Sequence, residues 1–160
     1  MPTIVAGGQT GVDRAALDAA LALGLSVGGW CPRGRRAEDG RIADRYPLIE
    51  TPLARPIQRT RWNVRDSDAT LAIVDGRPRG GTLMTLRAAA GRRPLLVLRP
   101  EARAARARAF LARHRVRRLN VAGPRASEAA DIYRRARRFL APIFAAWSGR
   151  RGQYLQEDGG

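Results

Sequence analysis

The sequence predicts an α/β protein, a Rossmann-like three-layer sandwich with a mainly parallel central sheet of about five strands. Two observations support this prediction. Short apolar runs alternate with longer amphipathic segments, and glycines or prolines separate most of them. Runs such as Leu71–Val74 and Leu95–Leu98 are apolar at every position, which is typical of parallel strands that helices cover on both faces.

Five segments have the pattern of strands and five have the pattern of helices. The strands are predicted at Thr3–Ala6, Leu25–Trp30, Ala69–Val74, Pro94–Leu98 and Arg118–Ala122. The helices are predicted at Val12–Leu23, Arg55–Val64, Gly80–Ala90 and Ala102–His114, with a last helix that Ser127 caps and that extends to Trp147. At the first helix, Thr10 and Asp13 have the form of a capping box, and Gly24 is placed to end the helix.

The remaining segments complete the predicted organisation. Residues 31–52 are rich in Pro, Gly, Arg and Asp, so we expect a long ordered loop, which in a compact domain is more often functional than idle. The elements together predict one Rossmann-like ligand-binding domain over residues 1–147. Residues 148–160 are polar and glycine-rich, and we expect them to form a flexible C-terminal tail.

The charge of the chain has two interpretations. The 160 residues carry a formal net charge of +16, and all 30 basic residues are arginine. Residues 1–80 have 12 arginines and 9 acidic residues, a net of +3, whereas residues 81–160 have 18 arginines and 5 acidic residues, a net of +13. A genome biased toward GC-rich codons would produce this arginine surface, but an excess of this size also fits a protein that binds a polyanion.

Several classes of protein are excluded by the composition. No apolar run approaches the roughly 20 residues that a membrane-spanning helix needs, and the N-terminus lacks the pattern of a secretory signal. We therefore expect a cytoplasmic protein with no membrane partner. Cys31 is the single cysteine and His114 the single histidine. An internal disulfide, a multi-cysteine zinc site and a histidine cluster are thus excluded within one chain, and no metal site is predicted.

The first candidate site is a glycine-rich turn between a predicted strand and a predicted helix. It contains Gly7, Gly8, Gln9, Thr10 and Gly11. Glycines allow the backbone to approach a ligand closely, and the free amides and the positive dipole end of the helix point at the same place. The spacing matches neither the Walker motif nor the dinucleotide-binding motif, so the turn predicts a site for an anion such as phosphate without specifying the nucleotide.

A second turn has the same character. Gly80, Gly81 and Thr82 follow a strongly apolar strand and open a helix. In a doubly wound sheet, two such turns from neighbouring strands meet at the topological switch point, where ligands bind. The charged loop at residues 31–52 adds Arg33 and Arg35, whose guanidinium groups are able to clamp a phosphate.

These motifs resemble those of the molybdenum cofactor carrier family. The resemblance covers about residues 4–145 and rests on the blocks GGQTGVDRAALDAA, GGWCPRGRRAEDG, YPL.ET, QRTRWNVRDSDATL, GGT..T and LNVAGPRAS, which occur in this order. The family is similar in fold to a wider Rossmann-like group that recognises nucleotides or nucleotide-derived ligands. That group includes the lonely-guy phosphoribohydrolases, formerly called lysine decarboxylase-like, and a DNA-processing recombination mediator.

The resemblance implies a binding protein for the molybdenum cofactor, which is a pterin with a phosphate and a dithiolene-held molybdate. It also implies a cytosolic homo-oligomer, a dimer or a tetramer. The phosphate is expected on Gly8, Gln9, Thr10 and Gly11, assisted by Gly80, Gly81 and Thr82, with charge from Arg14, Arg33 and Arg35. No catalytic residue is predicted on this interpretation.

Two alternatives remain open. The related phosphoribohydrolases carry P-G-G-x-G-T-x-x-E, in which the glutamate helps to cleave the glycosidic bond, but here Thr85 or Leu86 stands near its position. A nucleotide phosphoribohydrolase-like enzyme would therefore have to use Glu38, Asp39 or Asp13 instead. The second alternative is a nucleic-acid-binding protein that uses the arginine-rich second half, although the motifs favour a small phosphate-containing ligand.

Overall fold

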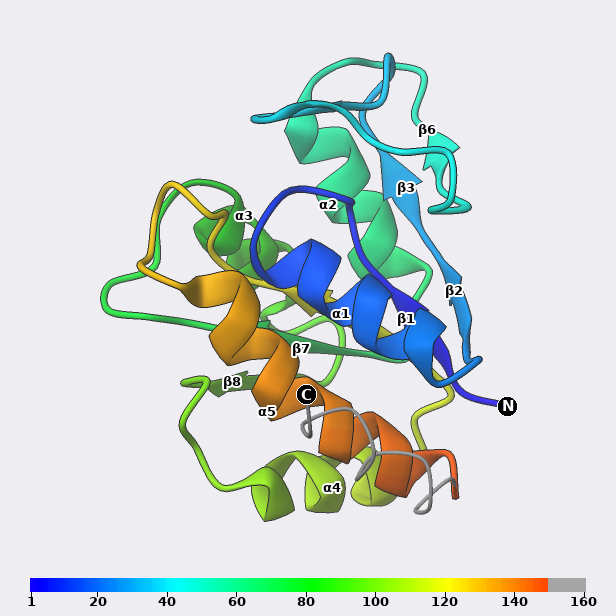
Figure 1. Ribbon diagram of the computed structural model, residues 1–160, viewed down its shortest axis with the longest axis vertical. Coiled ribbons are helices and arrows are strands. Elements are labelled where there is room, and N and C mark those ends of the chain that lie inside the picture. The colour runs from blue at the N-terminus through cyan, green and yellow to red at the C-terminus, as the bar shows by residue number, and fades with distance from the viewer. Residues whose placement is uncertain (150–160) are drawn as a thin grey trace, which may run out of the picture.

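A five-stranded parallel sheet lies at the centre of the computed structural model, which describes residues 1–149 (Figure 1). Its strands follow the order β2-β1-β9-β7-β8, and every neighbouring pair is parallel. The strands are β1 (Thr3–Val5), β2 (Ser26–Gly28), β7 (Ala69–Ile73), β8 (Leu95–Leu98) and β9 (Arg118–Ala122).

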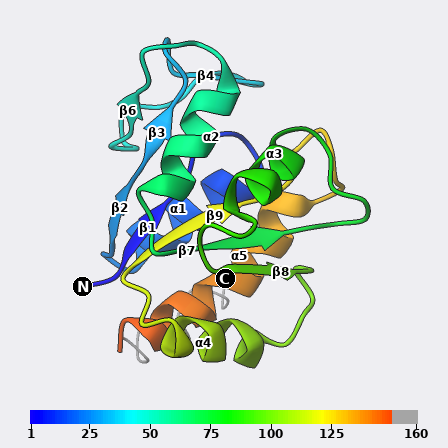
Figure 2. The ribbon, with the colours of Figure 1, turned by 180° about the vertical axis from the view of Figure 1, so that it is seen from behind.

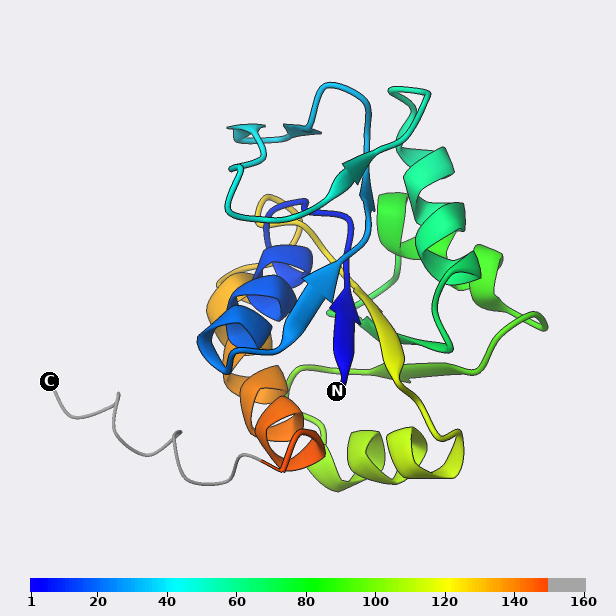
Figure 3. The same ribbon diagram turned by 90° about the vertical axis from the view of Figure 1, so that its right-hand side faces the viewer.

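Helices cover both faces of this sheet. One face carries α1 (Val12–Ala22) and α5 (Ile132–Trp147), and α4 (Ala104–Arg113) packs beside α5. The opposite face carries α2 (Pro56–Arg65) and α3 (Gly80–Ala89), as the two rotated views show (Figures 2 and 3). This arrangement confirms the predicted Rossmann-like sandwich.

The main core lies between the sheet and the face made by α1, α4 and α5. All five residues of β7 are buried, as expected of a strand that is covered on two sides. The prediction that Leu95–Leu98 is covered in the same way is wrong, because among residues 1–149 β8 is an edge strand that pairs only with β7, and Val97 is 39% exposed.

The second predicted strand ends earlier than expected. It stops at Gly28 because Gly29 takes a φ of +129°, and a Cβ there would lie 2.5 Å from the Ala6 carbonyl oxygen. The chain leaves the central sheet at this point. Trp30 and Cys31 form β3, which pairs in parallel with β6 (Ile49–Glu50) in a separate small sheet.

Residues 31–52 are therefore more structured than the predicted loop. Besides β3 and β6, they contain a hairpin of β4 (Arg36–Ala37) and β5 (Gly40–Arg41). A second apolar cluster fixes the segment to the rest of the fold, and its members are Ala6, Leu17, Cys31, Ile42, Tyr46 and Leu48. Strands of two residues carry no readable alternation, which explains why the pattern did not reveal them.

Two predicted helix caps are wrong. The last helix begins at Ile132 after Asp131, which has a φ of +53°, so Ser127 lies in the preceding turn and does not cap it. The residue that precedes α1 is Gly11, and the Thr10 side chain bonds to other segments. Gly24 has a φ of +67° just after α1, as predicted for a residue that ends a helix.

Residues 150–160 of the predicted tail lie outside the described residues. Among the helices of residues 1–149, none is long and apolar enough to cross a membrane.

Replacing Gly11 by alanine should destabilise the fold strongly. Gly11 has φ +78° and ψ −125°, and an added Cβ would lie 2.3 Å from the carbonyl oxygen of Pro124. We expect a loss of about 3 kcal/mol or more in the free energy of unfolding, measured by urea denaturation.

The matched control is Gly76→Ala. Gly76 has a similar φ of +77°, but an added Cβ would meet nothing within 4 Å. This variant should lose only the backbone term of about 1–2 kcal/mol. Equal losses in the two variants would contradict the role assigned to the close approach at Gly11.

Candidate functional site

A cavity of about 210 Å³ opens at the carboxyl ends of the central strands. The turn after β1, the end of β9 with the residues that follow it, and the start of α3 line this cavity, together with one side of α2. We call it the strand-end cavity. Carboxyl ends of parallel strands are where ligands bind in open α/β sheets.

The two glycine-rich turns both reach the strand-end cavity, but they do not come from neighbouring strands. The sequence prediction on this point is wrong, because β9 lies between β1 and β7. The chain after β9 therefore enters the site, and it contributes Gly123, Arg125 and Glu128 to the lining. The motif LNVAGPRAS includes the start of this segment, but the sequence prediction assigned none of its residues to the site.

The start of α3 presents free main-chain donors to the cavity. Gly80, Gly81 and Thr82 all line it, and α3 has no side-chain cap. Within residues 1–149, the first amide of α3 with a backbone acceptor is that of Leu83, which donates to the Arg79 carbonyl at 3.3 Å. The Thr82 hydroxyl is buried and has no hydrogen-bond partner in this described part of the chain. This end of α3 has the properties of an anion site.

The turn before α1 is organised differently. Gly7, Gln9 and Asp13 line the cavity, whereas Gly8, Thr10 and Gly11 do not. Gly8 packs on the side chains of Leu48 and Ile42, where a Cβ would come within 3 Å of both. The amide of Val12 is already used, because it donates to the Pro124 carbonyl at 3.1 Å.

A buried carboxylate occupies this first turn. Asp13 is 7% exposed and accepts hydrogen bonds from the amides of Gln9, at 3.2 Å, and Gly7. Burial raises the pKa of Asp13, and Arg59 and the two amides lower it only in part, so the pKa stays above its ordinary value. Some of the main-chain amides of this turn therefore already donate to a carboxylate of the protein itself.

Helix α2 supplies a wall that sequence reasoning missed. Arg59, Thr60 and Asn63 are buried and line the cavity. The Arg59 guanidinium donates to the Gly7 carbonyl at 2.9 Å and lies 3.8 Å from Asp13. A Cβ at Gly7 would lie 2.2 Å from this guanidinium, so Gly7 makes room for Arg59. The signal available in the sequence was polar residues at helical spacing within the motif QRTRWNVRDSDATL.

Arg35, which was predicted to contact a phosphate, makes structural contacts within its own segment. Its side chain is 10% exposed. It donates to four backbone carbonyls at 2.8 to 3.1 Å, which belong to Ile42, Ala43, Tyr46 and Leu48. The guanidinium therefore holds the 42–48 stretch together, and it does not line the strand-end cavity.

The other two predicted arginines also lie outside the cavity lining. Arg14 donates to Asp39 through two nitrogens, at 2.5 and 2.8 Å, and its Nε donates to the Gly8 carbonyl. The Arg14 guanidinium holds the pKa of Asp39 below its usual range. Arg33 is exposed on the surface.

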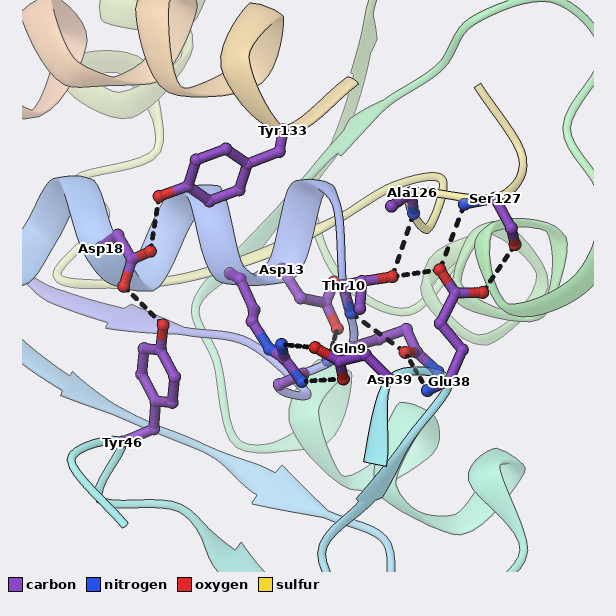
Figure 4. Close-up of polar contacts among 12 residues, drawn as sticks. Gln9, Thr10, Asp13, Asp18, Glu38, Asp39, Tyr46, Ala126, Ser127 and Tyr133 are labelled. Atoms are coloured by element: carbon purple, nitrogen blue, oxygen red, sulfur yellow. Dashed lines mark hydrogen bonds and ion pairs between the residues drawn. The ribbon is translucent and has the colours of Figure 1, made fainter. Parts of the chain in front are cut away.

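Glu38 fastens the β4–β5 hairpin to the turns beside the cavity (Figure 4). Its carboxylate accepts hydrogen bonds from the hydroxyls of Thr10 and Ser127 and from the Ser127 amide, and Arg125 lies 3.5 Å away. Burial raises the pKa of Glu38, but these hydrogen bonds outweigh it and the pKa lies below its usual value. Glu38 is thus a bound internal anion.

Another carboxylate on α1 also holds the 31–52 segment in place. The Asp18 carboxylate accepts hydrogen bonds from the hydroxyls of Tyr46 and Tyr133, both at 2.6 Å (Figure 4). It joins the 31–52 segment to α1 and α5. Burial, followed by the bond to Asp18, raises the pKa of both tyrosines.

A parallel sheet with helices on both faces and a cavity at its carboxyl edge defines a Rossmann-like α/β protein. Residues 4–144 match the circularly permuted YpsA SLOG family, and the chain belongs to that family. It is similar to a solved structure described as a putative molybdenum carrier protein from Syntrophus aciditrophicus SB, with 38% identity and a TM-score of 0.84 over 90% of this chain and 94% of that one. No curated protein matches the chain. These findings confirm the family resemblance predicted from the motifs.

Arg35→Lys should destabilise the protein by about 2–4 kcal/mol. A lysine keeps the charge but cannot reach all four carbonyls, and each buried acceptor left unpaired costs about 1–3 kcal/mol. The free energy of unfolding in urea measures this loss. Arg33→Lys, at an exposed position two residues earlier, is the control and should change stability by less than about 0.5 kcal/mol. A tolerated Arg35→Lys would contradict the assigned role.

Proposed function

We propose that this protein binds and carries a phosphate-bearing pterin or nucleotide-like ligand, and that the molybdenum cofactor is that ligand. The observation that carries the proposal is the uncapped N-terminus of α3 in the strand-end cavity. Three successive main-chain amides and a positive dipole end suit a phosphate. The name of the 38% identical structure supports a molybdenum-containing cargo.

The charges of the cavity are close to balanced. Arg59 lies 3.8 Å from Asp13, and Arg125 lies 3.5 Å from Glu128. Glu128 also approaches the start of α3, because an ideal Cβ on Gly80 would lie 3.4 Å from its Oε2. A phosphate at α3 is therefore recognised mainly by main-chain amides near Gly81, where an added Cβ would meet nothing within 4 Å.

A hydrolase remains the second candidate because of one observation. Of the three acids considered from the sequence, Asp13 alone lines the cavity, and its raised pKa suits a general acid. Glu38 and Asp39 are held by Ser127 and Arg14 instead. Release of free base from a panel of nucleoside monophosphates, abolished in Asp13→Asn, would support the hydrolase, and no turnover would favour the carrier.

The cargo itself is tested on protein purified from molybdenum-replete cells. We expect co-purified molybdenum and a fluorescent pterin after oxidation, and a thermal shift of the apoprotein with molybdopterin. Native mass spectrometry of the same sample measures the stoichiometry and the proposed cytoplasmic homo-oligomer. No shift with the molybdenum cofactor, molybdopterin or any nucleoside phosphate would contradict the proposal.

Gly81→Asp should weaken ligand binding and leave the fold intact. An aspartate in the first turn of a helix is favourable for the helix, but its carboxylate would occupy the anion site at α3. We expect at least about a tenfold loss of affinity for molybdopterin, measured by calorimetry. The thermal midpoint should stay within a few degrees of that of the unmodified protein.

The matched control is Gly81→Asn, which has nearly the same size and shape but no charge. It should lose less affinity than Gly81→Asp, because only the aspartate repels the phosphate. Equal losses would indicate a steric effect, and unchanged affinity in both variants would place the phosphate elsewhere.

As the pH falls, affinity for adenosine 5′-monophosphate should increase in the unmodified protein relative to Asp13→Asn. A bound phosphate raises the pKa of Asp13 further, so binding is coupled to proton uptake between the pKa of the free and of the bound protein, both above 3.8. Calorimetry between pH 8 and pH 5 measures this trend. In Asp13→Asn, the pH dependence of the affinity should be only that caused by titration of the phosphate itself. The same pH dependence in this variant as in the unmodified protein would contradict the prediction.

A further inference from the structure

We propose that Thr10, Arg125 and Ser127 form a second anion site, which takes a tetrahedral oxyanion in place of the Glu38 carboxylate. We call this set the oxyanion cradle, and Figure 4 shows its Thr10 and Ser127 beside Glu38. The proposal goes beyond the proposed function, because the cradle is a different set of donors from the start of α3. Glu38 is then the displaceable occupant of the site.

The donors of the cradle come from two distant segments and converge on one carboxylate. The Ser127 amide donates to Oε1 of Glu38 at 3.1 Å, and the Ser127 hydroxyl donates to Oε2 at 2.6 Å. The Thr10 hydroxyl also donates to Oε1, and it accepts a hydrogen bond from the Ala126 amide at 3.0 Å, which fixes its orientation. Hydroxyls, an amide and a guanidinium are the groups that hold phosphate in proteins.

Glu38 is able to leave without unfolding the segment that carries it. Its side chain is 19% exposed, so a rotation of that side chain into solvent is enough to vacate the cradle. The neighbouring residue of the hairpin keeps its own fastening, because Asp39 accepts two hydrogen bonds from Arg14. A carboxylate brings two oxygens to these donors, whereas a tetrahedral oxyanion brings up to four.

The cradle adjoins the strand-end cavity through Arg125. The guanidinium Nε of Arg125 lies 3.5 Å from Glu38 and 3.5 Å from Glu128, and Arg125 lines the cavity. Removing the charge of Glu38 leaves this guanidinium with a single carboxylate partner among the described residues. An oxyanion in the cradle would give Arg125 a second anionic partner again.

The test compares inorganic phosphate binding to Glu38→Ala and to the unmodified protein by calorimetry and by amide chemical shifts. We expect Glu38→Ala to bind phosphate at least about tenfold more tightly, with the largest shifts at the amides of Ala126 and Ser127. Thr10→Val or Ser127→Ala, added to Glu38→Ala, should remove the gain. If Glu38→Ala is poorly folded, Glu38→Gln keeps a hydrogen-bond acceptor and should show a smaller gain.

Asp39→Asn is the matched control, since it removes one negative charge from the adjacent residue and leaves Glu38 in place. It should show no gain, and an equal gain would overturn the proposal because it would reflect net charge alone. Gly81→Asp on the Glu38→Ala background separates the two sites. Phosphate binding that survives this change supports the cradle, whereas binding that it abolishes belongs to the strand-end cavity and overturns the cradle.

The source of the oxyanion is distinguished with three probes on Glu38→Ala. Molybdate or phosphate that shifts the Ser127 amide without the Gly81 amide identifies a free ion. Adenosine 5′-monophosphate that shifts both amides identifies a group carried by a larger ligand. No shift at Ser127 with any probe would overturn the proposal.

Discussion

The close approach between the start of α1 and the chain that leaves β9 is the contact on which the site depends. Gly11 leaves no room for a side chain against the Pro124 carbonyl, and that carbonyl accepts the Val12 amide at 3.1 Å. Gly123 is packed as tightly, because a Cβ there would lie 2.7 Å from the Ile73 carbonyl and 2.6 Å from Val12. Because Gly11 and Gly123 have no side chains, the chain segments at the ends of β1, β7 and β9 are able to lie in contact.

This contact determines the different character of the two helix N-termini. The segment after β9 covers the start of α1, uses the Val12 amide and brings Ser127 to the hairpin carboxylate. The same segment reaches the start of α3 through Glu128, but among residues 1–149 it leaves the amides of Gly80, Gly81 and Thr82 without a backbone acceptor. Two turns of similar sequence therefore have different chemistry, which is why we place the phosphate at α3.

The sequence predicted the central sheet well, because the periodicity of strands and helices is a local property. Apolar runs such as Ala69–Val74 and the helix after Gly11 needed no knowledge of distant residues. The site was predicted less well, since long-range contacts decide which residues form it. Glu38 bonds to Ser127, 89 residues away, and Arg59 donates to Gly7, 52 residues away. A local pattern carries neither contact.

Arg35 shows the same limit for charged residues. A loop rich in arginine suggests a phosphate clamp, but this guanidinium donates four of its five N–H groups to backbone carbonyls of residues 42–48. The residue type was compatible with both roles, and only the path of the 31–52 segment decides between them. The polar residues Arg59, Thr60 and Asn63 on α2 line the cavity, whereas Arg33 and Arg35 of the loop do not.

The net charge of +16 has little bearing on the cavity itself. Arg59 is balanced by Asp13 and Arg125 by Glu128, whereas the arginines of α4, such as Arg106 and Arg108, are exposed on the outside of the sandwich. Interactions between exposed charges are screened beyond roughly 10 Å at moderate salt. Main-chain amides neutralise no phosphate charge, so the recognition that we propose at α3 would depend on geometry more than on the field of the whole protein. The strongly basic surface is therefore compatible with a small anionic ligand, but it is not the reason for proposing one.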